Sequence, residues 1–217
     1  MARSVIAGAV AAFVLSAAPG AVCISVSAAT AGPSFDCARA SEPSEYKICA
    51  TASLAALDRR LAAAYRARLA REPAIKLQQK GWLLARDAGC GAEAECLSAF
   101  IGARLKWMSG TAPMATRKPH RLGECSLTTL KEKTNRFEGE PGSGSAAVYA
   151  NGGYQVSYDT EAGIEHAAVG DPVVFCLAFI PDECPPGDNR GWGYASGDLR
   201  TLEGWSLSES EHSCGGA

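Results

Sequence analysis

The sequence lacks the features that mark several protein classes. After its first thirty residues it has no apolar run near the ~20 residues that a membrane-spanning helix needs. With 21 basic and 23 acidic residues it has no excess of positive charge, so we expect no nucleic-acid partner. Its apolar content of 47% is too high for a disordered chain. The remaining class is an ordinary globular protein, with enough residues for one medium domain or two small ones.

Catalytic motifs are missing too. The chain contains no H-E-x-x-H zinc motif and no G-x-S-x-G nucleophile turn. The glycine-rich stretch 142–145 lacks the lysine of a phosphate-binding loop and is interpreted as a flexible loop. Of the three histidines, His212 lies two residues before Cys214, where a disulfide is favoured over a metal site if the chain is exported. We therefore expect no enzyme activity, no cofactor and no metal.

Cysteine is the unusual residue, with nine in a chain of 217. Exported proteins use cysteines for disulfides, whereas cytosolic proteins use them for metal or redox chemistry. The N-terminus indicates export. Residues 1–31 have Arg3 at their start, a fourteen-residue apolar run over 5–18, and small residues that suit cleavage after Ala28 or Ala31. We expect a signal peptide and a periplasmic or extracellular protein.

Cleavage after Ala31 would leave 186 residues and eight cysteines, an even number. The alternative is a lipoprotein with Cys23 as the lipidated residue. The surrounding sequence, Gly20-Ala21-Val22, disfavours it, because such sites have leucine three residues before the cysteine and glycine or alanine directly before it.

The mature chain divides into two parts of opposite charge. Residues 33–110 carry 12 basic and 8 acidic side chains, a net charge of +4, and residues 125–217 carry 5 and 14, a net charge of −9. Residues 111–124 have no hydrophobic period and are interpreted as a linker. Each part has four cysteines, so we predict an α+β fold of two disulfide-stapled domains, one helical and one mainly β. The cysteines are Cys37, Cys49, Cys90 and Cys96, then Cys125, Cys176, Cys184 and Cys214.

The first domain has helical periodicity. Leucines and a tyrosine recur every three or four residues over 54–69, with Arg59, Arg60, Arg66 and Arg68 between them. Ser53 is the expected N-cap, and Pro73 follows the end of this helix. A second helix is expected from about Ala74 to Asp87, ended by Gly89, and a third over 97–108. The short turn makes the first two antiparallel, which brings Cys90 towards Cys49.

The second domain has the patterns of β-strands. Residues 154–158 alternate polar and apolar side chains, 146–149 precede them, and Asn151-Gly152-Gly153 predicts a hairpin turn. The apolar run 173–179 has the length of a buried strand, and 199–201 and 205–207 are possible edge strands. Four cysteines allow three pairings in each domain. The antiparallel helices favour Cys49–Cys90, which leaves Cys37 with Cys96.

The first domain also resembles a known family. The order and spacing of Phe35-Asp36-Cys37, Glu45-Tyr46-Lys47-Ile48-Cys49, Gln79-Lys80-Gly81-Trp82 and Arg86-Asp87-Ala88-Gly89-Cys90 are similar to those of the LprI-type lysozyme inhibitor domain. The resemblance covers about residues 35–108 and does not extend to the second domain. It implies a protein of the bacterial envelope that binds and inhibits a lysozyme or another peptidoglycan-cleaving enzyme. The alternative is a non-catalytic envelope binding or structural module.

The negative charge of the second domain predicts which part of the protein attracts and contacts such a partner. Lysozymes are commonly basic, and an acidic surface speeds association with a basic protein. We expect Asp182, Glu183 and Asp188, beside Trp192, to contact the partner. The alternative is that these acids only keep a small β domain soluble.

Overall fold

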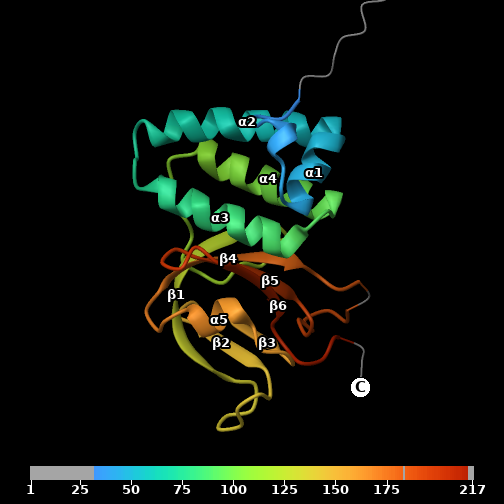
Figure 1. The fold of residues 1–217 in the computed structure, drawn as a ribbon, viewed down its shortest axis with the longest axis vertical. Helices are drawn as coiled ribbons and strands as arrows, with labels where there is room; N and C mark the ends of the chain where they lie inside the picture. Colours follow the sequence, from blue (N-terminus) through green and yellow to red (C-terminus); the bar gives the residue numbers. More distant parts are fainter. Residues whose placement is uncertain (1–31, 183, 215–217) are drawn as a thin grey trace, which may run out of the picture.

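The computed structural model describes residues 32–182 and 184–214 (Figure 1). The predicted signal peptide, residues 1–31, and Glu183 lie outside the described residues. Across the described part of the chain, no helix has both the length and the apolar character needed to span a membrane.

The N-terminal part is helical, as predicted. It consists of a short 3-10 turn and four α-helices: η1 (Cys37–Arg39), α1 (Pro43–Ala50), α2 (Ala52–Leu69), α3 (Ile75–Cys90) and α4 (Ala94–Ser109). Helix α1 is not marked by the periodicity of the sequence. It is started by Pro43 and by a capping box in which Glu42 and Glu45 accept hydrogen bonds from each other's backbone. The predicted N-cap Ser53 is wrong, because α2 already begins after Thr51.

Gly89 does not end the second predicted helix. Helix α3 continues through it to Cys90, and Gly91, with φ of +49°, terminates the helix. Gly89 is needed for a different reason: a Cβ there would lie 2.7 Å from the Cβ of Ala195 and 2.8 Å from that of Ala178. The glycine therefore allows the helix to approach the strands closely.

The C-terminal part is a closed barrel of six strands with one short helix. The elements are β1 (Cys125–Asn135), β2 (Ser145–Tyr149), β3 (Tyr154–Ser157), α5 (Ala162–His166), β4 (Pro172–Phe179), β5 (Gly193–Asp198) and β6 (Gly204–Ser208). All neighbours are antiparallel, in the order β1-β2-β3-β6-β5-β4. The hairpin turn at Asn151 is confirmed, since the Gly153 amide donates to its Oδ1.

One predicted edge strand is wrong. Residues 199–201 form the turn between β5 and β6, because Asp198 Oδ1 accepts hydrogen bonds from the amides of Arg200 and Thr201. Strand β5 was not predicted, because its residues are mostly small and form no apolar run or alternation.

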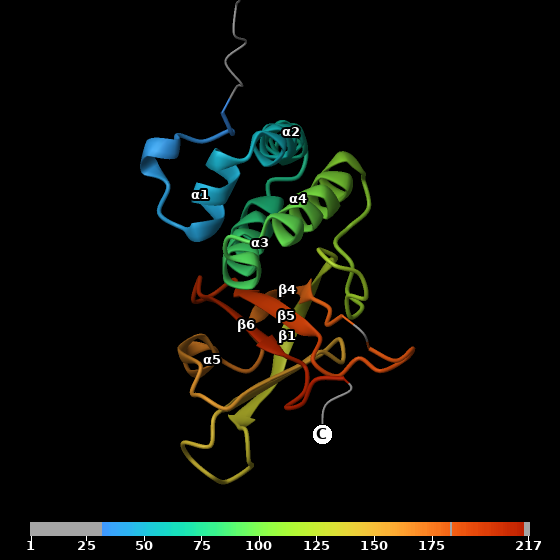
Figure 2. The same cartoon turned by 90° about the vertical axis from the view of Figure 1, so that its right-hand side faces the viewer.

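Helix α3 packs on the barrel, against β4, β5 and β6 (Figure 2). Trp82 and Ala85 of α3 share one hydrophobic core with Val174, Ala178 and Ala195 of the strands. The segment 111–124, predicted as a linker, contributes Met114 to this core. The division into two domains at these boundaries remains a prediction. In the structure, the helical part and the barrel pack against each other through one shared hydrophobic core.

The disulfides stay within each part, as predicted, but the preferred pairing is wrong. The bonds are Cys37–Cys49, Cys90–Cys96, Cys125–Cys176 and Cys184–Cys214. The antiparallel return of α3 does reach α1, where Ser44 Oγ donates to Asp87 Oδ1. Cys49, however, lies at the other end of α1, beside the η1 turn. Cys90 instead meets Cys96 across the short α3–α4 turn.

The barrel interior has a second core with a polar centre. Gln155 Oε1 accepts hydrogen bonds from the side chains of Tyr149, Ser196 and Trp205, and its amide donates to the Tyr194 carbonyl. All five residues are buried. Burial also raises the pKa of the Tyr149 hydroxyl, so this hydroxyl stays protonated and available as a donor.

Candidate functional site

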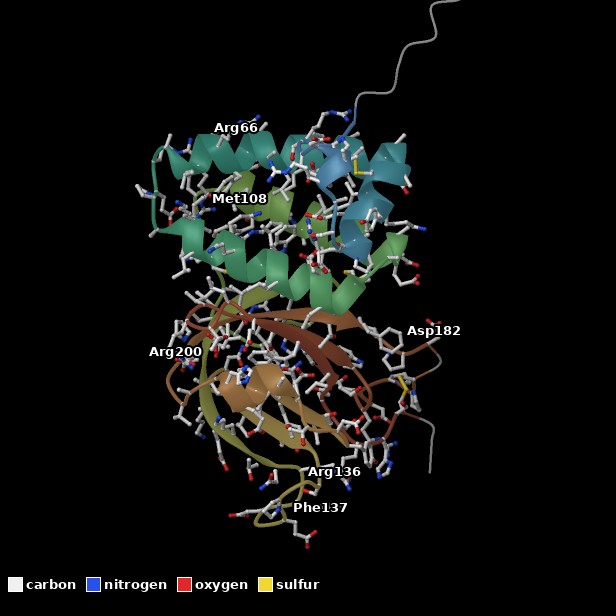
Figure 3. The ribbon with its side chains drawn as sticks, in the orientation of Figure 1. Arg66, Met108, Arg136, Phe137, Asp182 and Arg200 are labelled. Carbon is white, nitrogen blue, oxygen red and sulfur yellow. A yellow bond between two sulfur atoms is a disulfide. The ribbon has the colours of Figure 1, made fainter. Side chains whose placement is uncertain are left out.

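The predicted contact residues lie in the long connection between β4 and β5. Asp182 is exposed just after β4 (Figure 3). Asp188 and Trp192 follow in the segment that the Cys184–Cys214 disulfide ties to the C-terminal segment. Glu183 lies outside the described residues. The structure thus places three of the four residues on one connection, and their role in binding remains a prediction.

Two of these residues have partners within the protein. The Asp188 carboxylate accepts three hydrogen bonds from the guanidinium of Arg190, two from Nε at 3.0 and 3.2 Å and one from Nη2 at 2.7 Å. These bonds hold the pKa of Asp188 below its ordinary value. Trp192 is half-buried against the core of the barrel. Among the described residues of this connection, Asp182 is the acidic side chain without an ion pair or hydrogen bond.

The predicted arginine face of α2 is only partly a solvent-exposed surface. Arg60 and Arg66 are exposed, but Arg68 is buried. Its guanidinium donates to the carbonyls of Trp107 and Ala112 and pairs with Glu72. Arg68 therefore fastens α2 to the end of α4 and is not available to a partner.

A surface that the sequence analysis missed lies at the far end of the barrel. It is the loop between β1 and β2, residues 136–144, together with the end of β3, and we call it the barrel tip (Figure 3). Phe137 and Tyr158 are 46% and 57% exposed there. The Arg136 guanidinium stacks on both rings, at 3.8 Å and 4.2 Å from their centroids. This cation is itself neutralised by Glu211.

The barrel tip also carries free negative charge. Glu138, Glu140 and Asp159 are exposed, and their carboxylates have no ion pair or hydrogen bond with any residue that the structure describes. The loop is held by hydrogen bonds between its side chains and its backbone: Phe137 N–H donates to Ser143 Oγ at 3.0 Å, and Arg136 Nε donates to the Ser143 carbonyl. Nothing in the alternation of the sequence signals this surface, because it depends on residues brought together by the β1–β2 hairpin.

The residues of 32–182 and 184–214 form no group of three or more histidine, cysteine, aspartate or glutamate side chains that could hold a metal ion.

The comparison with known families found a match in the N-terminal part. The model of a protein family described as Lysozyme inhibitor LprI matches residues 37–125. The LprI match spans the helices α1 to α4 and the segment that leads to β1, and confirms the resemblance in the sequence. The match ends at Cys125, the first residue of β1, and does not extend over the rest of the barrel. No curated protein and no solved structure matches the chain.

Proposed function

We propose that the protein is an exported inhibitor of a lysozyme or a related peptidoglycan-cleaving enzyme. The observation that carries the proposal is the match of residues 37–125 to the lysozyme inhibitor family. Four disulfides and a core shared by helices and strands support it. A protein held rigid in this way loses little conformational entropy on binding, which favours tight inhibition. Disulfides also fit an oxidising compartment, the periplasm or the extracellular space.

The charge distribution supports a basic partner. Residues 125–217 carry a net charge of −9, and the uncompensated carboxylates of the described residues include those of the barrel tip. A basic lysozyme is attracted by such a field over a Debye length of ~8 Å at physiological salt. We place the first contact at Glu138, Glu140 and Asp159 around the exposed Phe137. The connection with Asp182, Glu183, Asp188 and Trp192 forms a second contact region.

A paired measurement tests this function. Residues 32–217, with the disulfides intact, are titrated into c-type and g-type lysozymes by calorimetry, and clearance of a peptidoglycan suspension is followed in the same mixtures. We expect binding to at least one type, with loss of clearance in proportion to complex formed. Binding without loss of clearance would favour a non-inhibitory envelope binding module. Absence of both at micromolar protein would overturn the proposal.

A further inference from the structure

A cavity of about 430 Å³ lies between α4 and the segment 110–125. It is lined by the aromatic side chains of Trp82 and Trp107, by Met114 and Leu122, and by the guanidinium-bearing Arg104. A volume of this size is typical of sites for small molecules. The cavity lies apart from both proposed contact regions, which belong to the barrel.

The cavity contains a buried cation, Arg104, that has no anionic partner within the part of the chain that the structure describes. Arg104 is 3% exposed. Its Nε donates to Gln79 Oε1 at 2.9 Å, its Nη1 has only the Met114 sulfur at 3.8 Å, and its Nη2 has no hydrogen-bond partner among the described residues. A thioether is a weak acceptor. Buried charges in proteins are normally paired with an opposite charge, so this arrangement is incomplete.

The surroundings increase the positive potential. Burial, with the repulsion of nearby Arg68, lowers the pKa of Arg104 to about 9, which still leaves it charged at neutral pH. Lys106 and Arg121 also line the cavity, are exposed, and have no ion pair within the described residues. The one acid of the lining, Glu124, is already bound by Arg117 and by the His120 amide.

Two more buried donors lack an acceptor among the described residues. The indole N–H groups of Trp82 and Trp107 are buried and make no hydrogen bond with the described residues. The two rings flank Arg104, with its guanidinium carbon 4.3 Å from the Trp107 centroid and 5.7 Å from that of Trp82. The lining thus combines unused donors and positive charge with flat apolar walls. An arginine fork matches the planar geometry of a carboxylate, and the rings match a hydrocarbon body.

We propose that this cavity binds a small carboxylate with an apolar body, and that the carboxylate replaces the Met114 sulfur as the hydrogen-bond acceptor of Arg104. Methionine suits this exchange, because its unbranched side chain adapts to a change in the cavity at little cost. The proposal does not depend on lysozyme binding.

Phenylacetate is the probe that tests it, with phenylacetamide and inorganic phosphate as matched compounds. Binding to residues 32–217 is measured by calorimetry and by tryptophan fluorescence. We expect saturable binding of phenylacetate and at least tenfold weaker binding of the neutral amide, a difference of about 1.4 kcal/mol, because a hydrogen bond between two charged groups is stronger than one to a neutral acceptor. Phosphate, which has no apolar body, should also bind at least tenfold more weakly. Equal binding of acid and amide, or of phosphate and phenylacetate, would overturn the proposal.

Variants locate the site without removing Arg104. Ala103 lies on the wall of the cavity. The larger side chain of the A103L variant should fill part of the cavity and weaken phenylacetate binding at least tenfold. A63L, at an exposed position of α2 outside the cavity, is its control and should bind like the parent. Met114→Leu removes the competing sulfur, so affinity should be kept or increased. Unchanged binding by A103L, a tenfold loss in M114L, or no phenylacetate binding at all would contradict the proposal.

Discussion

Gly81 of α3 and Gly197 of β5 meet backbone to backbone. A Cβ on Gly197 would lie 2.0 Å from the carbonyl oxygen of Gly81, and a Cβ on Gly81 would lie 2.3 Å from Leu199 Cδ2. Real Cβ atoms do not approach other atoms so closely, so one glycine on each surface lets the helix lie directly on the barrel. The shared core of the two parts depends on this contact.

Gly197→Ala tests that contact. The methyl group would push α3 from the barrel, and overpacking of this kind costs about 1–3 kcal/mol. Gly102, a glycine of α4 with open space at its Cβ, is the matched control. Gly102→Ala should stabilise the protein by about 0.5–1 kcal/mol. Urea unfolding measures both. Equal stability of the two variants would show that the helix does not sit on β5 as described.

The disulfides are predicted to differ in their contribution to stability. Cys125–Cys176 closes a separation of 51 residues and Cys90–Cys96 one of 6. On the chain-entropy account, removing the first pair by alanine substitution should cost about 4 kcal/mol and removing the second about 2 kcal/mol. Thermal or urea unfolding of the two double variants gives the order. The reverse order would contradict this account, and a non-reduced peptide map provides the check on pairing.

The polar centre of the barrel is expected to be a determinant of its stability. Gln155→Leu keeps the approximate size of the side chain but removes the acceptor shared by Tyr149, Ser196 and Trp205. Buried donors left without an acceptor cost about 1–3 kcal/mol. The exposed Thr129→Val in β1 is the control and should change the free energy of unfolding by less than about 0.5 kcal/mol. A Gln155→Leu protein as stable as the parent would contradict the network.

Asp171 gives the protein a pH dependence. Hydrogen bonding from Arg200, and from the Ala168 amide, lowers the pKa of its carboxyl group below the ordinary value. The stabilisation is therefore present above a pH of about 4 and is lost as pH falls through the folded-state pKa. Asp171→Asn should be less stable than the parent at neutral pH, with a difference that shrinks in acid. A difference that stays constant from neutral to acid pH would rule out this origin.

The barrel tip is predicted to steer a basic partner. Glu138→Gln with Glu140→Gln should slow association with a basic lysozyme at low ionic strength and make the rate less sensitive to salt, because neither carboxylate is paired with another described residue. Asp182→Asn with Asp188→Asn is the comparison for the β4–β5 connection, where Asp188 is already paired with Arg190. Stopped-flow association at several salt concentrations measures this. Identical salt dependence in the parent and the tip variant would exclude steering by the tip.

The sequence predicted what local patterns determine. The helices around Leu54, Leu61 and Leu97 follow from apolar spacing, and the hairpin at Asn151 follows from its turn residues. The disulfide partners could not be predicted in this way. Cys49 lies near the end of α1, a separate helix that the sequence pattern does not distinguish from α2, and this position places it beside Cys37 and not beside Cys90. Strand β5 was missed because glycine, alanine and serine carry no alternation, although their small size is what lets α3 approach.

The candidate sites were less accessible to sequence analysis. The acids of the β4–β5 connection are visible as a charged stretch, but their pairing, as between Asp188 and Arg190, is a property of the fold. The barrel tip joins a loop to the end of another strand. The site at Arg104 is recognised because buried donors of Arg104, Trp82 and Trp107 have no acceptor among the described residues. A sequence does not show which donors are buried or which acceptors they reach.

The most direct test of the account is a titration of lysozyme activity at a fixed enzyme concentration well above the dissociation constant. Residues 32–217, with all four disulfides formed, are added in increments and the initial rate of peptidoglycan clearance is measured. The account predicts a linear loss of activity that ends near one equivalent of protein for at least one lysozyme type. Full activity at a large molar excess over every type tested would contradict it.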